Sequence, residues 1–261
     1  MKTKIFIDGS EGTTGLRINE RFKGREDLEI LSIDPALRKD PAERKKLINA
    51  SDVTILCLPD AAAKEAVSLV ENDCVRIIDT STAHRTASGW AYGFPELSPE
   101  FRKKIREGKR IANPGCHASG FVALVYPLIR EGILPADYPV SSFSLTGYSG
   151  GGKKMIAQYE AEERSEELDA PREYGLNQQH KHLKEMTAIT GLAAPPLFTP
   201  IVADYYSGMV VSVPLYTGML KKSLTPEELR DFFAEYYGRE KFLTVAPFGS
   251  EAESGGFLSG N

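Results

Sequence analysis

Short apolar runs alternate with helix-like stretches through the first half of the chain. The apolar runs cover residues 5–7, 28–33, 53–58 and 75–78, and the run at 53–58 is almost unbroken. Such runs are typical of strands that are buried on both faces of a parallel sheet. Helical patterns follow the first three runs, the first of them with Leu16, Ile18 and Phe22 on its apolar side. This alternation predicts a Rossmann-like, doubly wound parallel sheet in an α/β domain.

Capping residues mark where these helices begin and end. Asp40 followed by Pro41 predicts a helix over residues 41–50, and Asp60 is expected to cap the alanine-rich helix that follows it. Ser98 and Pro99 predict another helix start, and Gly108 predicts the end of that helix.

The second half has strands with fewer helices between them. Apolar or alternating runs at 142–146, 197–203, 209–215 and 242–245 predict strands, and Thr225 with Glu228 predicts a capping box for a helix that Gly238 ends. Consecutive strands of this kind favour an α+β domain with a mixed or antiparallel sheet. We therefore predict two domains, residues 1–113 and 114–261.

Composition and charge narrow the class of protein. The 261 residues are 41% hydrophobic and 26% charged, with a formal net charge of -4. These values are typical of a globular domain and give no general attraction to nucleic acid. No apolar run approaches a membrane span, and the first residues do not resemble a signal peptide. Three cysteines cannot all pair and have no metal-type spacing, so we expect a cytoplasmic protein without a metal.

A glycine-rich turn joins the first predicted strand to the first helix. Backbone N–H groups in such a turn can approach the diphosphate of a dinucleotide at the helix N-terminus. Asp34 at the end of the second strand favours NAD, whereas Arg38 and Lys39 favour the 2′-phosphate of NADP, and the residues alone leave this choice open. The residues of the turn expected to contact the cofactor are Gly9, Ser10, Gly12, Thr13, Thr14 and Gly15.

Cys116 lies at the start of a helical run that Pro127 is expected to disturb. A thiol at a helix N-terminus faces the positive end of the helix dipole, which raises its thiolate fraction. The small residues 118–120 are expected to leave room for an acyl group and a nicotinamide ring. Cys57 and Cys74 lie in or beside apolar strands, and we interpret them as buried structural cysteines.

Four histidines are present, of which His180 and His182 are the most suggestive. An imidazole can exchange a proton near neutral pH, and Glu185 is close enough in sequence to orient one of them or to contact substrate. His84 and His117 are interpreted as ordinary loop residues. Arg85 follows the fourth strand, where the anion of a substrate can bind.

A second hypothesis arises from residues 147–151, which match the G-x-S-x-G pattern of a serine hydrolase. Ser149 would be the nucleophile and His180 the base. In that case, however, the N-terminal glycine turn has no role.

The chain as a whole resembles the N-acetyl-gamma-glutamyl-phosphate reductase family, in particular its shorter class. The matching stretches are residues 7–15, 79–85, 93–97, 113–116, 147–152, 180–185 and 195–206. The resemblance implies a fold like that of glyceraldehyde-3-phosphate dehydrogenase and NADP as the cofactor. It also implies that Cys116 is the nucleophile and His180 the acid/base. The implied reaction reduces N-acetyl-glutamyl 5-phosphate to the semialdehyde through a thioester, in arginine biosynthesis. The family continues past Asn261, so we expect a shortened chain.

The residues and the resemblance together predict the partners, the alternative functions and the full set of site residues. A small-molecule substrate and a homo-oligomer, dimer or tetramer, are expected, with no nucleic-acid or membrane partner. Alternatives are another acyl-phosphate reductase such as aspartate-semialdehyde dehydrogenase, the serine hydrolase, or an inactive nucleotide-binding remnant. Beyond Cys116 and His180, the expected substrate-binding residues are Arg85, Asn113, Ser149, Gly150, His182 and Glu185. Besides the glycine turn, the expected cofactor-binding residues are Arg38, Pro59 and Ser81.

Overall fold

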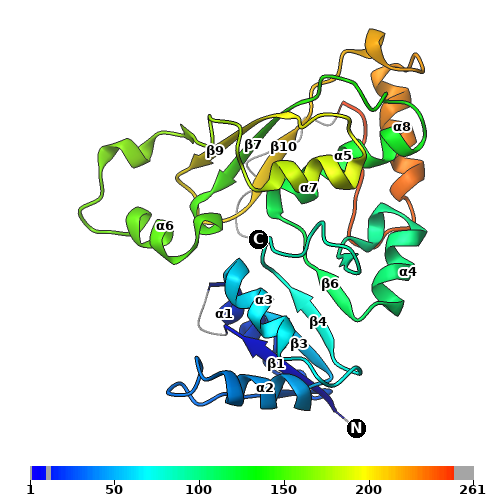
Figure 1. Ribbon diagram of the computed structural model, residues 1–261. Coiled ribbons are helices and arrows are strands. Elements are labelled where there is room, and N and C mark those ends of the chain that lie inside the picture. Colours follow the sequence, from blue (N-terminus) through cyan, green and yellow to red (C-terminus); the bar gives the residue numbers. More distant parts are fainter. Residues whose placement is uncertain (1, 10–12, 250–261) are drawn as a thin grey trace. The chain divides into compact units, whose positions relative to one another are not determined.

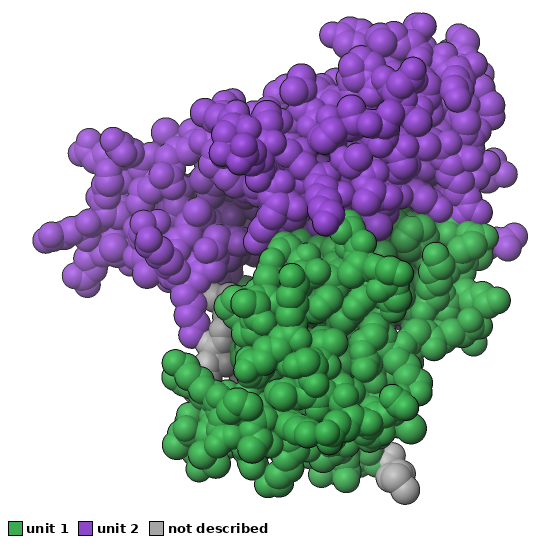
Figure 2. All heavy atoms as spheres, in the orientation of Figure 1, with its two compact units in different colours: residues 1–114 green, residues 115–261 purple. Residues whose placement is uncertain are grey.

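The computed structural model describes residues 2–9 and 13–249. The chain forms two compact units, residues 1–114 and 115–261, coloured separately in Figure 2. We describe each unit by itself.

The first unit contains a six-stranded sheet whose strand pairs are all parallel. The strand order is β2-β1-β3-β4-β6-β5. Its strands are β1 (Thr3–Asp8), β2 (Leu28–Leu31), β3 (Val53–Leu56), β4 (Arg76–Asp79), β5 (Ala91–Tyr92) and β6 (Arg110–Ala112). Its helices are α1 (Thr13–Phe22), α2 (Pro41–Ala50), α3 (Asp60–Ser68), the short η1 (Pro95–Leu97) and α4 (Pro99–Glu107).

Both faces of this sheet are covered by helices (Figure 1). Phe6 packs with Ile48 of α2 and Ala63 of α3, whereas its neighbours Ile5 and Ile7 pack on the other side with residues of α1. Alternate residues of a strand point to opposite faces, so one apolar strand supplies two cores. The predicted doubly wound sheet is confirmed.

Helix boundaries in this unit follow the capping residues, with one correction. The Asp40 side chain accepts from the N–H groups of Ala42 and Glu43, and α4 runs from Pro99 to Glu107 with Gly108 as its C-cap. The prediction that Asp60 caps α3 is wrong. Pro59 is the N-cap residue, and the Asp60 carboxylate accepts from the N–H and hydroxyl of Thr82 instead.

The second unit contains a four-stranded mixed sheet with the order β10-β7-β9-β8. β7 and β9 are parallel, and the two outer pairs are antiparallel. The strands are β7 (Ser141–Gly147), β8 (Arg172–Glu173), β9 (Leu197–Ala203) and β10 (Met209–Ser212). The helices are α5 (Cys116–Arg130), α6 (Gly152–Tyr159), α7 (His182–Thr190) and α8 (Pro226–Tyr237), with short turns η2 (Tyr148–Gly151), η3 (Glu166–Asp169) and η4 (Thr217–Met219).

Pro127, which is expected to disturb this helical run, lies inside α5. A proline inside a helix leaves the carbonyl four residues earlier without its N–H partner. Here that carbonyl belongs to Ala123, and it accepts from the hydroxyl of Tyr237 at 2.7 Å. The side chain from α8 therefore supplies the hydrogen bond that Pro127 removes, and the helix continues to Arg130.

Three strand predictions differ from the structure, one in the existence of the strand and two in where the strand ends. Residues 242–245 do not form a strand, and Phe242 is 80% exposed. β10 ends at Ser212 and not at residue 215, and Pro214 lacks the N–H that a ladder requires. β2, at the edge of its sheet, ends at Leu31 and not at residue 33. The predicted capping box at Thr225 and the helix end at Gly238 are confirmed.

The sheet of the second unit has one buried face and one partly exposed face, and the buried face carries Phe198 and Val202 of β9 besides hydroxyl residues of β7. Ser142, Ser144 and Thr146 of β7 are buried on one face of the sheet. Gly120 of α5 packs against Val211, the β10 partner of Ser144, so this is the face that α5 covers. A Cβ on Gly120 would meet Val211 at 2.5 Å, so this glycine permits the close approach of helix and sheet. Phe143 on the opposite face is 47% exposed and Leu197 is 67% exposed. Among the described residues, no helix has both the length and the apolarity to cross a membrane.

Candidate active site

Cys116 is the first residue of α5, and its thiol is exposed. The preceding Gly115 is the N-cap residue, and its N–H donates to Oε1 of Glu185 at 2.8 Å. Glu185 lies on α7 and is 2% exposed. A buried carboxylate that accepts a backbone N–H holds the turn before Cys116 rigidly against α7. The structure thus brings Cys116 and Glu185 into one site.

His117, His180 and His182 form a compact group, which we call the histidine cluster. Their ring centroids lie 4.7 Å apart for His180 and His182, and 5.6 and 5.5 Å from His117 to each of them. Phe198 of β9 packs edge-on against His117 and His180. Because His117 is adjacent to Cys116 in the chain, the cluster places three imidazoles beside the start of α5.

The interpretation of His117 as a loop residue is wrong. It lies in α5 and is 3% exposed, with Nδ1 2.6 Å from the Ser144 hydroxyl and Nε2 2.8 Å from the Tyr174 hydroxyl. Burial, followed by the charges of His180 and Lys181, lowers the pKa of His117 to about 4. His117 is therefore neutral at physiological pH and is held on both ring nitrogens.

Tyr174 is a residue of this site that the sequence did not reveal. Burial, followed by the nearby Cys116 thiolate, raises the pKa of Tyr174 to about 12. Its hydroxyl therefore keeps its proton near neutral pH and lies near the thiol. The only signal in the sequence was its position six residues before His180.

The orientation of His180 follows from the start of α7. The backbone N–H of His182 donates to Nδ1 of His180 at 3.2 Å. In the neutral ring, an Nδ1 that accepts a hydrogen bond places the proton on Nε2. Burial and the charge of Lys181 lower the pKa of His180, so the neutral form is favoured. His180 therefore presents an Nε2–H donor.

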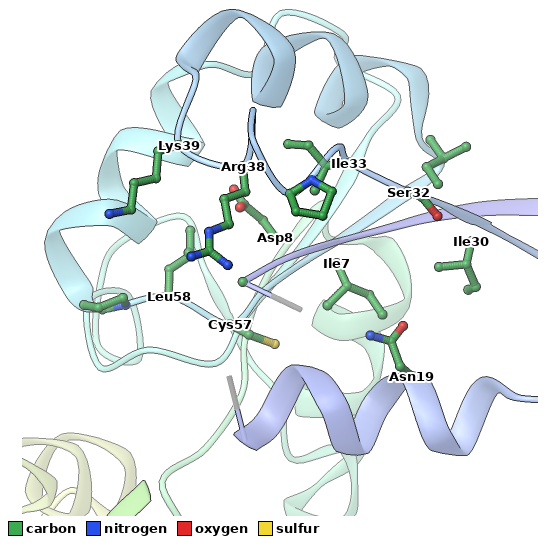
Figure 3. A pocket seen from close by; sticks show the side chains of 14 residues that line it. Ile7, Asp8, Asn19, Ile30, Ser32, Ile33, Arg38, Lys39, Cys57 and Leu58 are labelled. Carbon is green, nitrogen blue, oxygen red and sulfur yellow. The ribbon is translucent and has the colours of Figure 1, made fainter. Parts of the chain in front are cut away.

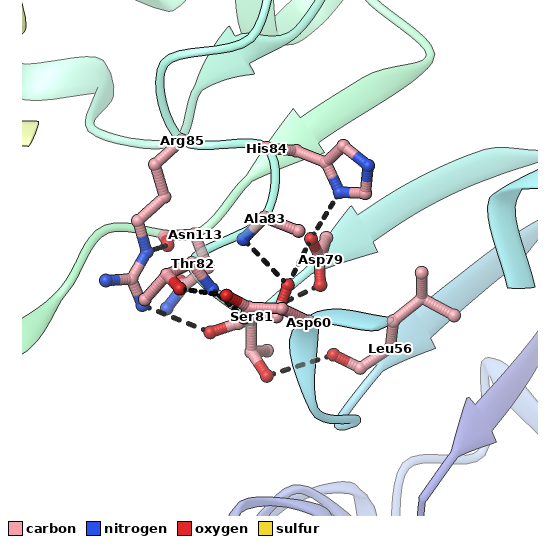
Figure 4. A network of polar contacts seen from close by, with 10 residues as sticks. Leu56, Asp60, Asp79, Ser81, Thr82, Ala83, His84, Arg85 and Asn113 are labelled. Carbon is pink, nitrogen blue, oxygen red and sulfur yellow. Dashed lines mark hydrogen bonds and ion pairs between the residues drawn. The ribbon is translucent and has the colours of Figure 1, made fainter. Parts of the chain in front are cut away.

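In the first unit, a buried carboxylate organises the loop that carries Arg85 (Figure 4). Asp79 at the end of β4 accepts from the N–H and hydroxyl of Ser81 and contacts Nδ1 of His84 at 2.6 Å. The His84 ring stacks on Trp90 at 4.0 Å, so His84 is a structural anchor and not an ordinary loop residue. Arg85 donates from Nε to the carbonyl of Asn113 and from Nη2 to that of Thr80. Arg85 and Asn113, both expected to bind substrate, are thus brought together.

A pocket of about 490 Å³ lies at the carboxyl ends of β1 and β3 (Figure 3). Gly9, Arg38 and Pro59 line it, as do Ser32 and Lys39. Gly9 has a φ of +87°, and a Cβ there would meet the carbonyl oxygen of Cys57 at 2.4 Å, so only glycine fits. Thr13, Thr14 and Gly15 form the first turn of α1. Ser10 and Gly12 lie outside the described residues.

The remaining cysteines occupy different surroundings. Cys57 lines the same pocket and is half-buried, and burial raises its pKa to about 11. Cys74 is exposed, so its interpretation as a buried cysteine is wrong.

Ser149 and Gly150 lie in the turn η2 between β7 and α6, which is the local context of a nucleophile elbow. The Ser149 N–H donates to the carbonyl of Tyr206, whereas its hydroxyl has no hydrogen bond to a histidine within residues 2–9 and 13–249. A serine nucleophile requires such a base, so this geometry gives no support to the hydrolase hypothesis.

Comparison with known proteins places this site in a family. Residues 3–105 match the model of the semialdehyde dehydrogenase NAD-binding domain, and residues 116–256 match that of the semialdehyde dehydrogenase dimerisation domain. N-acetyl-gamma-glutamyl-phosphate reductase 2 from Nostoc sp. is 51% identical over 251 residues, which cover 95% of this chain and 78% of that protein. The chain belongs to the N-acetyl-gamma-glutamyl-phosphate reductase family. The reductase from Sinorhizobium medicae is 47% identical over 97% of this chain and 82% of its own length.

Solved structures support the fold of this reductase family member. The aspartate semialdehyde dehydrogenase from Francisella tularensis superposes with a TM-score of 0.64 at 15% identity, covering 90% of this chain and 80% of that one. Aspartate semialdehyde dehydrogenase II from Vibrio cholerae has a TM-score of 0.66 at 13% identity, covering 96% and 85%. At this identity the likeness concerns the fold alone. The chain is thus an NAD(P)-dependent oxidoreductase with a nicotinamide-binding domain and a glyceraldehyde-3-phosphate dehydrogenase-like architecture.

Proposed function

We propose that this protein reduces N-acetyl-L-glutamyl 5-phosphate to N-acetyl-L-glutamate 5-semialdehyde and phosphate, with NADPH, in arginine biosynthesis. The observation that carries the proposal is Cys116 at the start of α5, beside the histidine cluster, in a chain whose relatives are named for this reaction.

The first step is assigned to Cys116. Its thiolate forms a bond to the acyl carbon while the bond from that carbon to the phosphate oxygen breaks, and phosphate leaves with the electron pair. The positive end of the α5 dipole favours the thiolate. The Tyr174 hydroxyl, which is hydrogen-bonded to Nε2 of His117, stays protonated near Cys116 and adds no second negative charge there.

When bound, the reduced nicotinamide supplies a hydride to the thioester carbon. His180 then donates from Nε2 to the oxygen that gains negative charge, which is the oxyanion stabilisation expected of a fixed donor. The carbon–sulfur bond breaks, the aldehyde leaves, and Cys116 returns to the thiolate. Arg85, Asn113, Ser149, Gly150, His182 and Glu185 are the residues we assign to substrate binding and orientation.

The pocket at the end of β1 fits a dinucleotide. The pocket combines Gly9, a position that only glycine can occupy, with apolar walls from Ile30 and Ile33. Arg38 and Lys39 add cationic side chains. We assign the 2′-phosphate of NADP to Arg38 and Lys39, and we assign Pro59 and Ser81 to further contacts with the cofactor.

Arg38→Ala is expected to weaken NADPH binding by about tenfold or more and to leave NADH binding nearly unchanged, because only NADPH carries the phosphate that Arg38 contacts. Fluorescence titration of both cofactors measures the ratio. Lys46→Ala, which removes an exposed cation of α2 that pairs with Glu43, is the matched control. An equal loss for NADH and NADPH contradicts the assignment.

The exposed face of the second sheet fits the assembly of two copies. Phe143 and Leu145 of β7 lie beside Thr199 and Ile201 of β9, and Val210 of β10 continues the row. A contiguous exposed apolar face is typical of an interaction surface. The matched family model is that of a dimerisation domain, and we assign the homodimer contact to this face.

Phe143→Glu is expected to weaken dimerisation by about thirtyfold or more, the usual effect of losing a central apolar contact. Sedimentation velocity over a concentration series measures the change. Phe242→Glu alters another exposed aromatic side chain, outside the sheet, and should leave the oligomeric state unchanged. If Phe143→Glu sediments like the unsubstituted chain, the interface lies elsewhere.

The reaction itself is tested with the purified chain. We expect the loss of NADPH absorbance to require N-acetyl-glutamyl phosphate. Aspartyl phosphate tests the alternative of an aspartate-semialdehyde dehydrogenase. Faster turnover of aspartyl phosphate would overturn the proposed substrate.

A further inference from the structure

The end of β1 carries a buried ion pair that the proposed reaction does not use. Asp8 is 3% exposed and lines the dinucleotide pocket immediately before Gly9. Nε and Nη2 of Arg44 both lie 3.0 Å from Oδ2 of Asp8. Nη1 of Arg44 donates to Glu65 of α3, also at 3.0 Å. Arg44 therefore joins the end of β1 to helices α2 and α3.

The position of Asp8 presents an electrostatic problem for a dinucleotide site. A carboxylate directly before the glycine turn adds negative charge where an anionic diphosphate is expected to bind. In a poorly hydrated position that charge is only weakly screened. Arg44 supplies a compensating positive charge from within the protein, on a side chain that is itself 5% exposed.

We propose that Arg44 is a positioning residue for the cofactor: it neutralises and immobilises Asp8 so that the diphosphate of a nicotinamide dinucleotide can approach Gly9. This inference rests on the proposed use of the pocket for that cofactor. It adds a role for α2, whose contribution to the site is a charge behind the pocket wall and not a contact with the ligand.

The charged groups around Asp8 determine how the loss of its partner Arg44 would change the pKa of Asp8. Arg44 faces it from α2, and Glu65 of α3 and the half-buried Cys57 lie near enough for their charges to interact with it. Burial raises the pKa of Asp8, whereas Arg44 lowers it. Without Arg44, the lowering contribution is lost and the pKa rises further. Asp8 would then be neutral at low pH and would ionise beside the diphosphate as the pH increases.

The decisive variant is Arg44→Met, measured by NADPH and NADH titration between pH 6 and 8.5 and expressed relative to the unsubstituted chain at each pH. We expect affinity for both cofactors to fall by about tenfold or more at pH 8.5 and to recover toward pH 6. NADH and NADPH should weaken by the same factor, because they share the diphosphate. A loss confined to NADPH would contradict the inference.

Asp8→Asn/Arg44→Met removes both charges and should restore affinity without the added pH dependence. The double variant also separates an effect of charge from an effect on folding, because it contains no unpaired buried carboxylate. Glu65→Gln, which alters the exposed partner of Arg44, should change affinity little. If the double variant binds as weakly as Arg44→Met at every pH, Arg44 has only a structural role. If the unsubstituted chain binds neither cofactor, the proposed function fails instead.

Discussion

Cys116→Ser should abolish reduction of the acyl phosphate, while NADPH still binds with nearly unchanged affinity. A serine hydroxyl at the start of α5 is not ionised near neutral pH, so the covalent step is lost, whereas the dinucleotide pocket lies on β1, β3 and the segment after β2. We expect a loss of at least about a thousandfold in kcat/KM, measured by NADPH absorbance.

Cys74→Ser is the matched control for this experiment. Cys74 is also an exposed cysteine, but it lies in the loop before β4 and should be replaced without effect on turnover. Mass spectrometry of the protein mixed with acyl phosphate, without NADPH, should locate the acyl group on the Cys116 peptide. Acyl mass on the Ser149 peptide would support a hydrolase, and unchanged turnover of Cys116→Ser would exclude the thioester mechanism.

His180→Asn should lower kcat by about a hundredfold or more, the usual effect of losing one hydrogen-bond donor to an oxyanion. Asparagine keeps the approximate size of the ring but cannot present the same Nε2–H at the position that the N–H of His182 defines. His182→Asn should have a smaller effect, expressed mainly in KM, because His182 is assigned to substrate orientation. A larger loss of kcat at His182 would reverse the two roles.

The pH profile gives an independent test of the histidine cluster. Burial and Lys181 lower the pKa of His180, so the neutral ring persists below the ordinary histidine range, and activity should decline only at lower pH. Lys181→Met removes a positive charge that disfavours protonation. It should therefore raise the pKa of His180 and move the acid limb of kcat/KM to higher pH. An acid limb that does not move would show that His180 does not govern it.

Much of the fold is predictable from local features of the chain. Apolar runs located β1, β3 and β4, and Asp40, Ser98 and Thr225 located helix starts, because each cap acts on N–H groups two or three residues away. The predictions failed where the deciding partner is distant. Pro127 is expected to disturb α5, yet the hydroxyl of Tyr237 satisfies the carbonyl of Ala123, 114 residues away, which Pro127 leaves without its N–H partner.

The candidate site shows the same division. The sequence by itself determined that Cys116 follows a turn and begins a helix, that His180 and His182 are close together, and that a glycine turn follows β1. Only the tertiary structure decided that Glu185 holds the N–H of Gly115 across 70 residues, that His117 joins Tyr174 across 57, and that Arg44 pairs with Asp8 across 36. Side-chain periodicity indicates which face of an element is buried, but not which side chain it meets there. Contacts between distant side chains depend on how the helices and sheets pack. In this protein, the packing decides which residues surround the thiol and which charge lies behind the cofactor pocket.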